Sequence, residues 1–270
     1  MKEVAAIRRG ITTGCNEFFF LEQTSQKAPR GLVHVTNGDG WAGILEEQVL
    51  VSAVQRAGEC DRPIFRPRRL LFCAGEMPPE HAYSYIRHGE TMGYHQRATC
   101  RARRRWWELP IESPQKELIA FNYNIYDTGR SYVSRVSPTY YSDSFHVLLA
   151  DNLKCLHAYM CSTLFHFFVN VDARTVFGGG KAKLQTYELA DLLCPSHLVA
   201  IEEDATFHGT YELLCRSSEA PVLQSLSSPT HLTLDNMIFD LVGLTQSERS
   251  SVYDALAELV GSRLAKADSL

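Results

Sequence analysis

Five arginines and two tryptophans crowd the segment HQRATCRARRRWW at 95–107, and these side chains are suited to binding nucleic acid. Guanidinium groups pair bidentately with phosphates and with the major-groove edge of guanine. Indole rings stack on bases or cover the aliphatic stems of arginines. We therefore predict a DNA contact made by Arg97, Arg101, Arg103, Arg104, Arg105, Trp106 and Trp107. The alternative is that the tryptophans are core residues and the arginines form a solvated or acid-paired face.

A second polar pattern is the segment RRGITTGCNEFFFL at 8–21, in which two glycines bracket two threonines. Gly10 and Gly14 indicate a tight turn whose hydroxyl and N–H groups can meet an anion or a base edge. Thr12, Thr13 and Asn16 are the candidate base readers, because short polar side chains on such a turn can approach a groove. The same residue types also fit a turn that leads into a buried strand.

A glycine run, VFGGGKAK at 176–183, is similar to a nucleotide-binding loop but fails its specific tests. A phosphate-binding P-loop needs Ser or Thr after the lysine, whereas Ala182 follows Lys181. The Phe-x-Gly-x-Gly pattern of S-adenosylmethionine-dependent methyltransferases is missed as well, because Lys181 replaces its second glycine. We interpret the run as flexible backbone that approaches DNA closely. Its candidate contacts are Arg174, Gly178, Gly179, Gly180, Lys181 and Lys183.

Catalytic patterns are missing from the sequence. The Asn/Asp-Pro-Pro-aromatic motif that grips an exocyclic amino group is absent, since Pro78 and Pro79 stand between Met77 and Glu80. No Glu-x-Lys or Asp-x-Lys pair marks a metal-dependent nuclease, and no Gly-x-Ser-x-Gly marks a hydrolase. The eight cysteines are irregularly spaced without a Cys-x-x-Cys pair. We therefore predict no catalytic residue, metal site or cofactor site in this chain.

Hydrophobic patterning predicts strands at 18–21, 69–73, 118–126 and 145–150, with mainly helical structure after them. A helix is expected at 79–88, ended by Gly89, and another at 152–168, capped by Asp151 or Asn152. Near the end, Asp235 is expected to cap a helix that Gly243 closes.

Thr245 and Glu248 form a capping box for a last helix, which is expected to pair with the one before it as a hairpin. These elements predict an α+β fold: a mixed, strand-rich recognition region with a central amphipathic helix and a carboxy-terminal helical hairpin. The predicted domains are a recognition region at 1–215, a Ser- and Pro-rich linker at 216–230, and the hairpin at 231–270.

Length and composition fit an ordinary globular protein, with 270 residues, 45% of them hydrophobic and 21% charged. The net charge of −4 hides an asymmetry: residues 56–105 carry 11 Arg or Lys against 5 Asp or Glu, and residues 188–270 carry 4 against 13. A nucleic-acid partner is therefore compatible with the acidic total. No apolar run approaches the roughly 20 residues that span a bilayer, so we expect a cytoplasmic protein without membrane contact.

Together these motifs resemble the carboxy-terminal target-recognition region of adenine-N6 DNA methyltransferases of the fused type IIG restriction-modification kind. The similar segments occur in family order and span nearly the whole chain: RRGITTGCNEFFFL at 8–21, YIRHGE and TCRARRRWWEL within 85–109, CSTLFHFFVNVDARTVFGGGKAKLQTYELADLLCP at 161–195, and LDNMIFDLVGLTQSERSSVYDALAELV at 234–260.

The resemblance implies sequence-specific recognition of double-stranded DNA, with S-adenosylmethionine bound and a flipped adenine methylated by a separate domain or subunit. The chain would then be a trimmed part, a truncated gene product or a specificity subunit. Two alternatives stay open: an unrecognised or degenerate methyltransferase or nuclease, and a subunit that docks a partner protein through the acidic residues 188–270.

Overall fold

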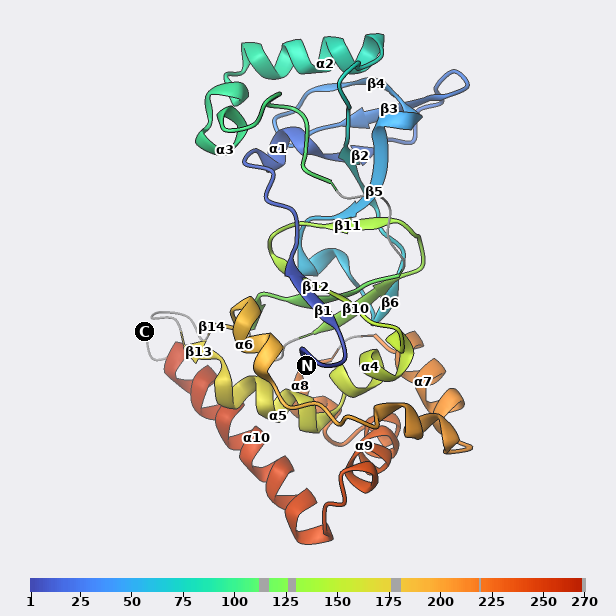
Figure 1. Ribbon diagram of the computed structural model, residues 1–270, viewed down its shortest axis with the longest axis vertical. Coiled ribbons are helices and arrows are strands. Elements are labelled where there is room, and N and C mark those ends of the chain that lie inside the picture. Colours follow the sequence, from blue (N-terminus) through green and yellow to red (C-terminus); the bar gives the residue numbers. More distant parts are fainter. Residues whose placement is uncertain (112–116, 126–129, 176–180, 219, 269–270) are drawn as a thin grey trace.

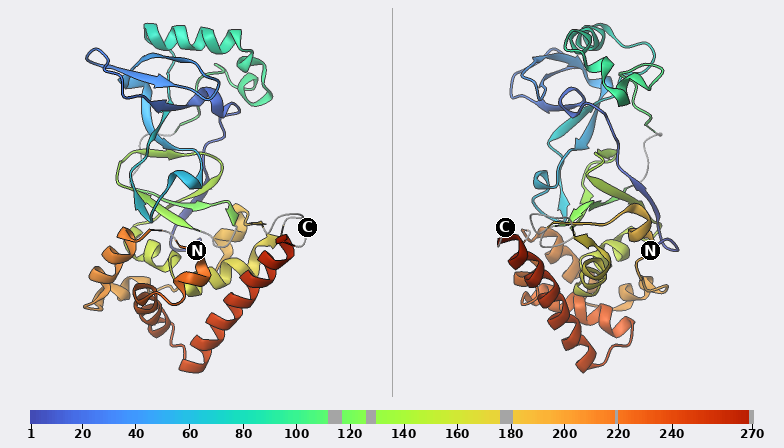
Figure 2. Two further views of the ribbon diagram at one scale, coloured as in Figure 1. Left: turned by 180° about the vertical axis from the view of Figure 1, so that it is seen from behind. Right: turned by 90° about the vertical axis from the view of Figure 1, so that its left-hand side faces the viewer.

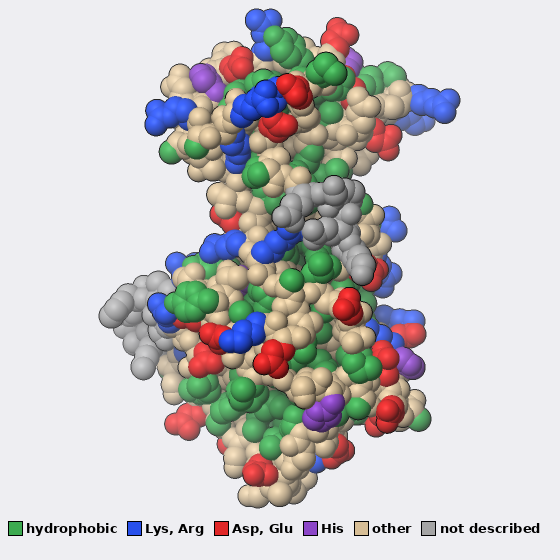
Figure 3. Space-filling view, in the orientation of Figure 1, with side chains coloured by type: hydrophobic (Ala, Val, Ile, Leu, Met, Phe, Trp, Pro, Cys, Tyr) green, Lys and Arg blue, Asp and Glu red, His purple; other side chains and the backbone are tan. Residues whose placement is uncertain are grey.

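The computed structural model describes residues 1–111, 117–125, 130–175, 181–218 and 220–268, and it has two lobes along its long axis (Figure 1). The upper lobe is rich in strands, the lower lobe consists mainly of helices, and a narrower waist joins them (Figures 1 and 3). The predicted α+β fold is confirmed.

A six-stranded sheet forms the upper lobe in the order β11-β5-β7-β2-β3-β4. Only β11 and β5 run parallel within it. Its strands are β2 (Phe20–Gln23), β3 (Leu32–Thr36), β4 (Ala42–Glu46), β5 (Leu50–Val54), β7 (Arg69–Phe72) and β11 (Thr139–Tyr141). The lobe also holds helices α1 (Asn16–Phe19), α2 (Glu80–Thr91) and α3 (Ala98–Arg101). The strand predicted at 18–21 thus begins two residues later, because Phe18 and Phe19 end α1.

A five-stranded sheet lies at the waist in the order β1-β12-β8-β10-β6, with only β10 and β6 parallel. Its strands are β1 (Ala6–Arg9), β6 (Ile64–Phe65), β8 (Ile119–Asn122), β10 (Ser131–Ser134) and β12 (Phe145–Leu149). A small third sheet consists of β9 (Asn124–Ile125), β13 (Arg174–Thr175) and β14 (Ala182–Lys183). The strands predicted at 69–73 and 145–150 are confirmed, and 118–126 contains two strands.

The two large sheets exchange edge strands. β6 follows β5 in sequence but pairs with β10 at the waist, whereas β11 follows β10 but pairs with β5 in the upper lobe. A hydrophobic cluster that includes Val54, Phe65, Tyr132 and Tyr141 fills the space between the sheets. Each large sheet therefore has one edge strand whose neighbours in sequence belong to the other large sheet.

The lower lobe contains the remaining helices, and one predicted boundary there is wrong. Its helices are α4 (Leu153–Met160), α5 (Thr163–Asp172), α6 (Thr186–Asp191), α7 (Phe207–Arg216), α8 (Val222–Ser225), α9 (Pro229–Leu241) and α10 (Gln246–Asp268). The single helix predicted at 152–168 is two helices, because Ser162 begins a new one by accepting a 3.3 Å hydrogen bond from the Phe165 N–H.

The prediction that Asp235 caps a helix is also wrong. Asp235 lies inside α9 and is fully buried, and its carboxylate accepts hydrogen bonds from the Thr163 N–H at 2.8 Å and from the Tyr253 hydroxyl at 2.9 Å. It therefore ties α5, α9 and α10 together. The Thr245–Glu248 capping box is confirmed, with the Thr245 N–H donating to Glu248 Oε2 at 2.8 Å.

Gly89 does not end its helix, contrary to the prediction. α2 continues to Thr91, and the chain turns at Gly93, whose φ is +77°. A Cβ atom at Gly89 would come within 2.5 Å of the Trp106 ring and 2.7 Å of the Phe18 ring. Gly89 therefore allows these aromatic rings to pack directly against the helix backbone.

The predicted domain division at 216–230 stays a prediction. Helix α8 and the first residues of α9 lie in that segment, and Leu214 before it shares a hydrophobic cluster with Ile238 after it. Within the described residues, no helix is long and apolar enough to cross a membrane.

Candidate nucleic-acid interface

The glycine turn (residues 10–14) carries the chain from the waist sheet into the upper lobe (Figures 1 and 2). A Cβ atom at Gly10 would come within 2.0 Å of the Ser142 carbonyl oxygen, so only glycine fits this close approach. Gly14 has a φ of +77°, which favours glycine. The fold itself therefore explains both glycines, before any ligand is considered.

The three predicted base readers on this turn differ in accessibility. Thr13 is 1% exposed, and its hydroxyl donates a 2.5 Å hydrogen bond to Asn16 Oδ1 and accepts one from the Cys15 N–H at 3.2 Å. Thr12 is exposed, with its hydroxyl 3.3 Å from Asp143 Oδ2. Thr12 is thus the residue of the three that presents its side chain outward, while Thr13 and Asn16 brace the turn.

Arg103 fastens the arginine segment (residues 95–107) to the glycine turn. Its guanidinium donates to the carbonyl oxygens of Thr12 at 2.9 Å, Thr13 at 2.8 Å and Trp106 at 3.2 Å. The same group lies 5.5 Å from the centre of the Phe19 ring. A DNA contact by Arg103 stays a prediction; here the side chain holds two backbone segments together.

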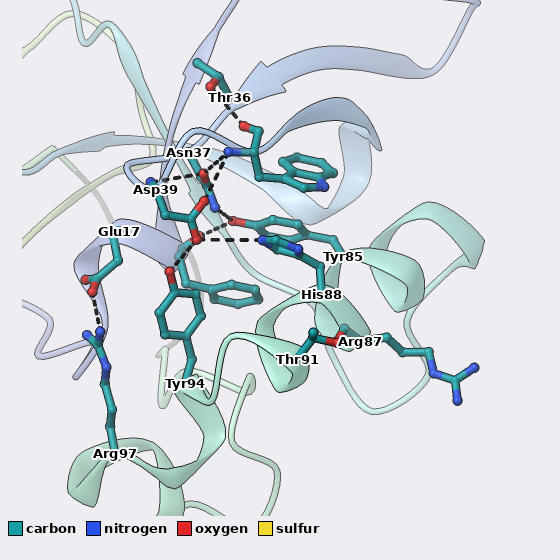
Figure 4. Close-up of polar contacts among 12 residues, drawn as sticks. Glu17, Thr36, Asn37, Asp39, Tyr85, Arg87, His88, Thr91, Tyr94 and Arg97 are labelled. Carbon is teal, nitrogen blue, oxygen red and sulfur yellow. Dashed lines mark hydrogen bonds and ion pairs between the residues drawn. The ribbon is translucent and has the colours of Figure 1, made fainter.

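Acidic residues neutralise two further arginines of the segment. Arg97 pairs with Glu17 at 2.5 Å, a hydrogen bond that raises the pKa of the arginine (Figure 4). Arg105 is paired with Glu76 and, at 3.1 Å, with Glu108, and its side chain is only 18% exposed. These pairs match the acid-paired alternative considered for the segment.

Arg101 and Arg104 face the solvent. Arg101 is the last residue of α3 and is exposed. The Arg104 side chain is 82% exposed and lies 4.0 Å from Glu76, a distance at which an exposed ion pair is weak. Of the five arginines, these two can meet a phosphate without first giving up a close partner.

The tandem tryptophans are packed in this structure. Trp106 is 8% exposed, its ring centre lies 4.8 Å from that of Phe18, and its Nε1–H donates to Glu90 at 3.3 Å. Trp107 is half-buried and donates to the Gly75 carbonyl oxygen at 3.3 Å. Their geometry therefore fits the core interpretation better than base stacking.

A polar network holds the arginine segment beneath the β3–β4 turn (Figure 4). The Tyr94 hydroxyl donates to Asp39, and His88 Nε2 lies 3.7 Å from the same carboxylate. Burial alone would raise the pKa of Asp39, but the hydrogen bonds from Tyr94 and the Trp41 N–H lower it below its usual value. The carboxylate is thus held in its charged form, which links the turn to the segment that precedes α3.

The second predicted cationic region lies in the small third sheet. Arg174 pairs with Glu188 at 2.5 Å yet remains 64% exposed, Lys181 is exposed, and Lys183 is half-buried 5.9 Å from the Tyr123 ring centre. The predicted contacts at Gly178, Gly179 and Gly180 lie outside the described residues.

Arg8 and Arg9 were not predicted as site residues, although they open the motif that contains the glycine turn. Both are exposed, and the Arg9 guanidinium lies 3.7 Å from the Tyr123 ring centre. Together with Thr12 and Tyr140 they line a cavity of about 270 Å³ at the waist. Figure 3 shows Lys and Arg side chains on both edges of this waist. The adjacent arginine pair before Gly10 was the signal that could have identified them.

His146 and His157 are fully buried in the packed interior. Burial lowers the pKa of His146 and of His157 to about 4. His157 lies 2.8 Å from the Tyr211 hydroxyl and 3.2 Å from the Ser131 carbonyl oxygen. Among the described residues, no group of three His, Cys, Asp or Glu side chains could hold a metal ion.

Comparison with known proteins gives one family and a set of similar folds. The sequence model of the family described as type II methyltransferase M.Eco57I, C-terminal domain, matches residues 1–227. No curated protein matches the chain.

The fold is similar to that of the type IIG restriction endonuclease BpuSI, with a TM-score of 0.59 and 12% identity over 97% of this chain and 30% of that one. It is also similar to the type IIL restriction-modification enzyme MmeI, solved in complex with DNA, with a TM-score of 0.57 and 10% identity over 97% of this chain and 36% of that one. The chain thus spans about a third of the length of these structures.

Proposed function

This chain belongs to the family of the C-terminal domain of type II methyltransferase M.Eco57I, and from that premise we propose that it recognises a specific sequence in double-stranded DNA. It would do so as the recognition module of an adenine-N6 DNA methyltransferase in a type IIG restriction-modification system. A separate domain or subunit would bind S-adenosylmethionine and transfer the methyl group to a flipped adenine. Such a role would place the chain in the cytoplasm with the DNA.

One contact carries the proposal: the hydrogen bonds from Arg103 to the glycine turn. They bring the segment that bears the exposed cations Arg101 and Arg104 against the turn that bears the exposed Thr12. Cations that meet phosphates position a protein on DNA, whereas short polar side chains beside them can read base edges. We therefore assign phosphate contact to Arg101 and Arg104, and base reading to Thr12.

Three of the other predicted residues support this surface from behind. Thr13 and Asn16 brace the turn, and Trp106 packs behind it with Phe18. Arg174, Lys181 and Lys183 offer a further basic edge, in which Lys183 and Arg9 both approach the Tyr123 ring, and this edge fits a duplex that contacts both regions.

The test is binding of labelled duplex DNA to the 270-residue chain at about 50 and about 200 mM salt. We expect binding that weakens steeply with salt, and a double variant Arg101→Gln/Arg104→Gln whose slope of log affinity against log salt is smaller by about 1.8, at about 0.9 per lost phosphate contact. The control is Lys2→Gln/Arg216→Gln, which removes two exposed, acid-paired cations from the helical lobe. A parent chain that binds no duplex at either salt concentration would refute the proposal.

Base reading is tested with a panel of duplexes of different sequence. Thr12→Ala should change the preference between duplexes by about 1–3 kcal/mol, the value of a good base contact, while the arginine variant weakens binding to all of them alike. If Thr12→Ala preserved every relative affinity, the reader would lie elsewhere on the chain.

A further inference from the structure

A second group of arginines lies at the waist, away from the arginine segment. Arg62, Arg66, Arg68 and Arg135 line an open groove of about 360 Å³, together with Asp61, Ile64, Phe65 and Pro67. We call it the Arg66 groove. β6 and β10, which border it, lie near the helical lobe in Figure 1, whereas α3 lies high in the upper lobe. The groove is therefore a separate surface from the one that bears Arg101 and Arg104.

Strand pairing explains why residues so far apart in sequence meet here. β6 and β10 run parallel, with Phe65 beside Ser134, and the Arg135 N–H continues the pairing by donating to the Phe65 carbonyl oxygen at 2.8 Å. Arg66 and Arg135 are thus the residues that follow the carboxyl ends of two neighbouring parallel strands. Pro67 favours an extended conformation for Arg66, and Arg68 two residues later lines the same groove.

The charges of this groove are poorly balanced. Its lining holds four arginines and one acid, Asp61, which lies 3.4 Å from Arg62. Arg66, Arg68 and Arg135 are exposed, and no acidic side chain among the described residues lies within ion-pair distance of them. The next residue, Arg69, gives the contrast, since it pairs with Glu22 and Glu59, both at 2.7 Å.

Clustered cations that outnumber the nearby acids repel one another, so this arrangement is stabilised when an anion enters the groove. Guanidinium groups favour phosphate oxygens, which they can bind bidentately. The groove is open along the surface, which suits a continuous polyanion better than a small enclosed ligand. β1, which ends at Arg9, and β6, which precedes Arg66, are the two edge strands of the five-stranded sheet, so cations lie at both edges of that sheet.

We propose that the Arg66 groove binds phosphates of the DNA backbone, as a second anchoring contact for the duplex that the chain recognises. The proposal rests on the proposed function and adds a site to it. Arg66 and Arg68 contribute the main phosphate contacts from one strand connection, and Arg135 contributes from the neighbouring one.

The test measures duplex binding by the 270-residue chain and by Arg66→Gln/Arg68→Gln as salt rises. Loss of two phosphate contacts should reduce the slope of log affinity against log salt by about 1.8. Over a fourfold rise in salt, from about 50 to about 200 mM, the affinity of the parent should then fall about twelve times more than that of the variant. Addition of Arg135→Gln to this double variant should reduce the slope by about 0.9 more.

Two controls separate charge from fold. Lys2→Gln/Arg216→Gln removes the same charge from the helical lobe and should keep the parent slope. Arg66→Lys/Arg68→Lys keeps both charges and should restore most of the slope, because lysine still meets phosphate as a point charge.

The outcomes distinguish this site from the proposed function as a whole. A parent that binds DNA with steep salt dependence and a glutamine variant that behaves like the charge control would overturn the groove and leave the proposed function standing. Equal loss of binding in the glutamine and lysine variants would also overturn it, since the effect would then come from packing. A parent without DNA binding removes both proposals.

Discussion

Arg103 and Arg104 are adjacent in sequence, but the structure predicts opposite consequences for their loss. Arg103→Gln removes three hydrogen bonds from a guanidinium to the carbonyl oxygens of Thr12, Thr13 and Trp106. A hydrogen bond that involves a charged group contributes about 1.5–3 kcal/mol; water replaces the bond to the exposed Thr12 carbonyl oxygen, and the glutamine amide can keep part of the other two. We therefore expect Arg103→Gln to lower the free energy of unfolding by about 2–4 kcal/mol.

Arg104→Gln is the matched control for this prediction. Its side chain is 82% exposed and makes only the 4.0 Å contact with Glu76, so its loss should change the free energy of unfolding by less than about 0.5 kcal/mol. Urea unfolding of both variants measures the difference. Thermal unfolding should show a midpoint lower by about 5–15 °C for Arg103→Gln alone.

Duplex binding completes the comparison between the two variants. Arg104→Gln should reduce the salt slope by about 0.9 without loss of stability, because it removes a phosphate contact only. If Arg103→Gln unfolded like the parent and showed only a smaller slope of log affinity against log salt, Arg103 would be a phosphate ligand and not a brace, which would refute this prediction.

Three further predictions concern the core, the response to pH and the cofactor. Gly89→Ala places a methyl group against the rings of Trp106 and Phe18, so urea unfolding should show a free energy of unfolding lower by about 1–3 kcal/mol. Gly209→Ala is the control and should lower it less, because Gly209 is exposed and has open space around it. Burial lowers the pKa of His157 from 6.5 to about 4, so the unfolded chain takes up a proton at a higher pH than the folded chain. The free energy of unfolding should therefore fall by up to about 3 kcal/mol as pH drops from about 6.5 to about 4. His157→Gln should lose this part of the pH dependence, and a variant with the same pH profile as the parent would contradict the prediction. Because the cofactor and adenine-gripping motifs are missing, calorimetry should detect no stoichiometric S-adenosylmethionine binding by the chain alone, and methyl transfer should require a methyltransferase domain.

Local sequence signals predicted those parts of the fold that depend on neighbouring residues. The Thr245–Glu248 capping box is an example, because its two hydrogen bonds join residues three positions apart. Gly243 also ends α9 as expected, with a φ of +72°. By contrast, the role of Asp235 depends on Thr163 and Tyr253, which lie on other helices. A capping preference cannot reveal a partner 72 residues away.

The candidate site was predicted by composition but not by geometry. The sequence shows the arginine segment as a concentration of charge, but it does not show that Glu17 and Glu76 take up two of these charges from distant parts of the chain. The Arg66 groove was missed because Arg135 joins Arg66 only through the parallel pairing of β6 with β10. Pairing between distant strands is set by the whole fold, so no local window of sequence contains it.

The exchange of edge strands limits how this chain can be recombined with its relatives. A hybrid protein that replaced only residues 10–111 would import a foreign β6 and leave behind the native β11, so both large sheets would pair a strand from one parent with a strand from the other. Side chains from the two parents would then have to pack together in the cluster between the sheets, which includes Val54, Phe65, Tyr132 and Tyr141. A transplant of the upper lobe therefore has to carry β10, β11 and their packing residues with it, or else confine itself to exposed positions such as Thr12, the proposed base reader.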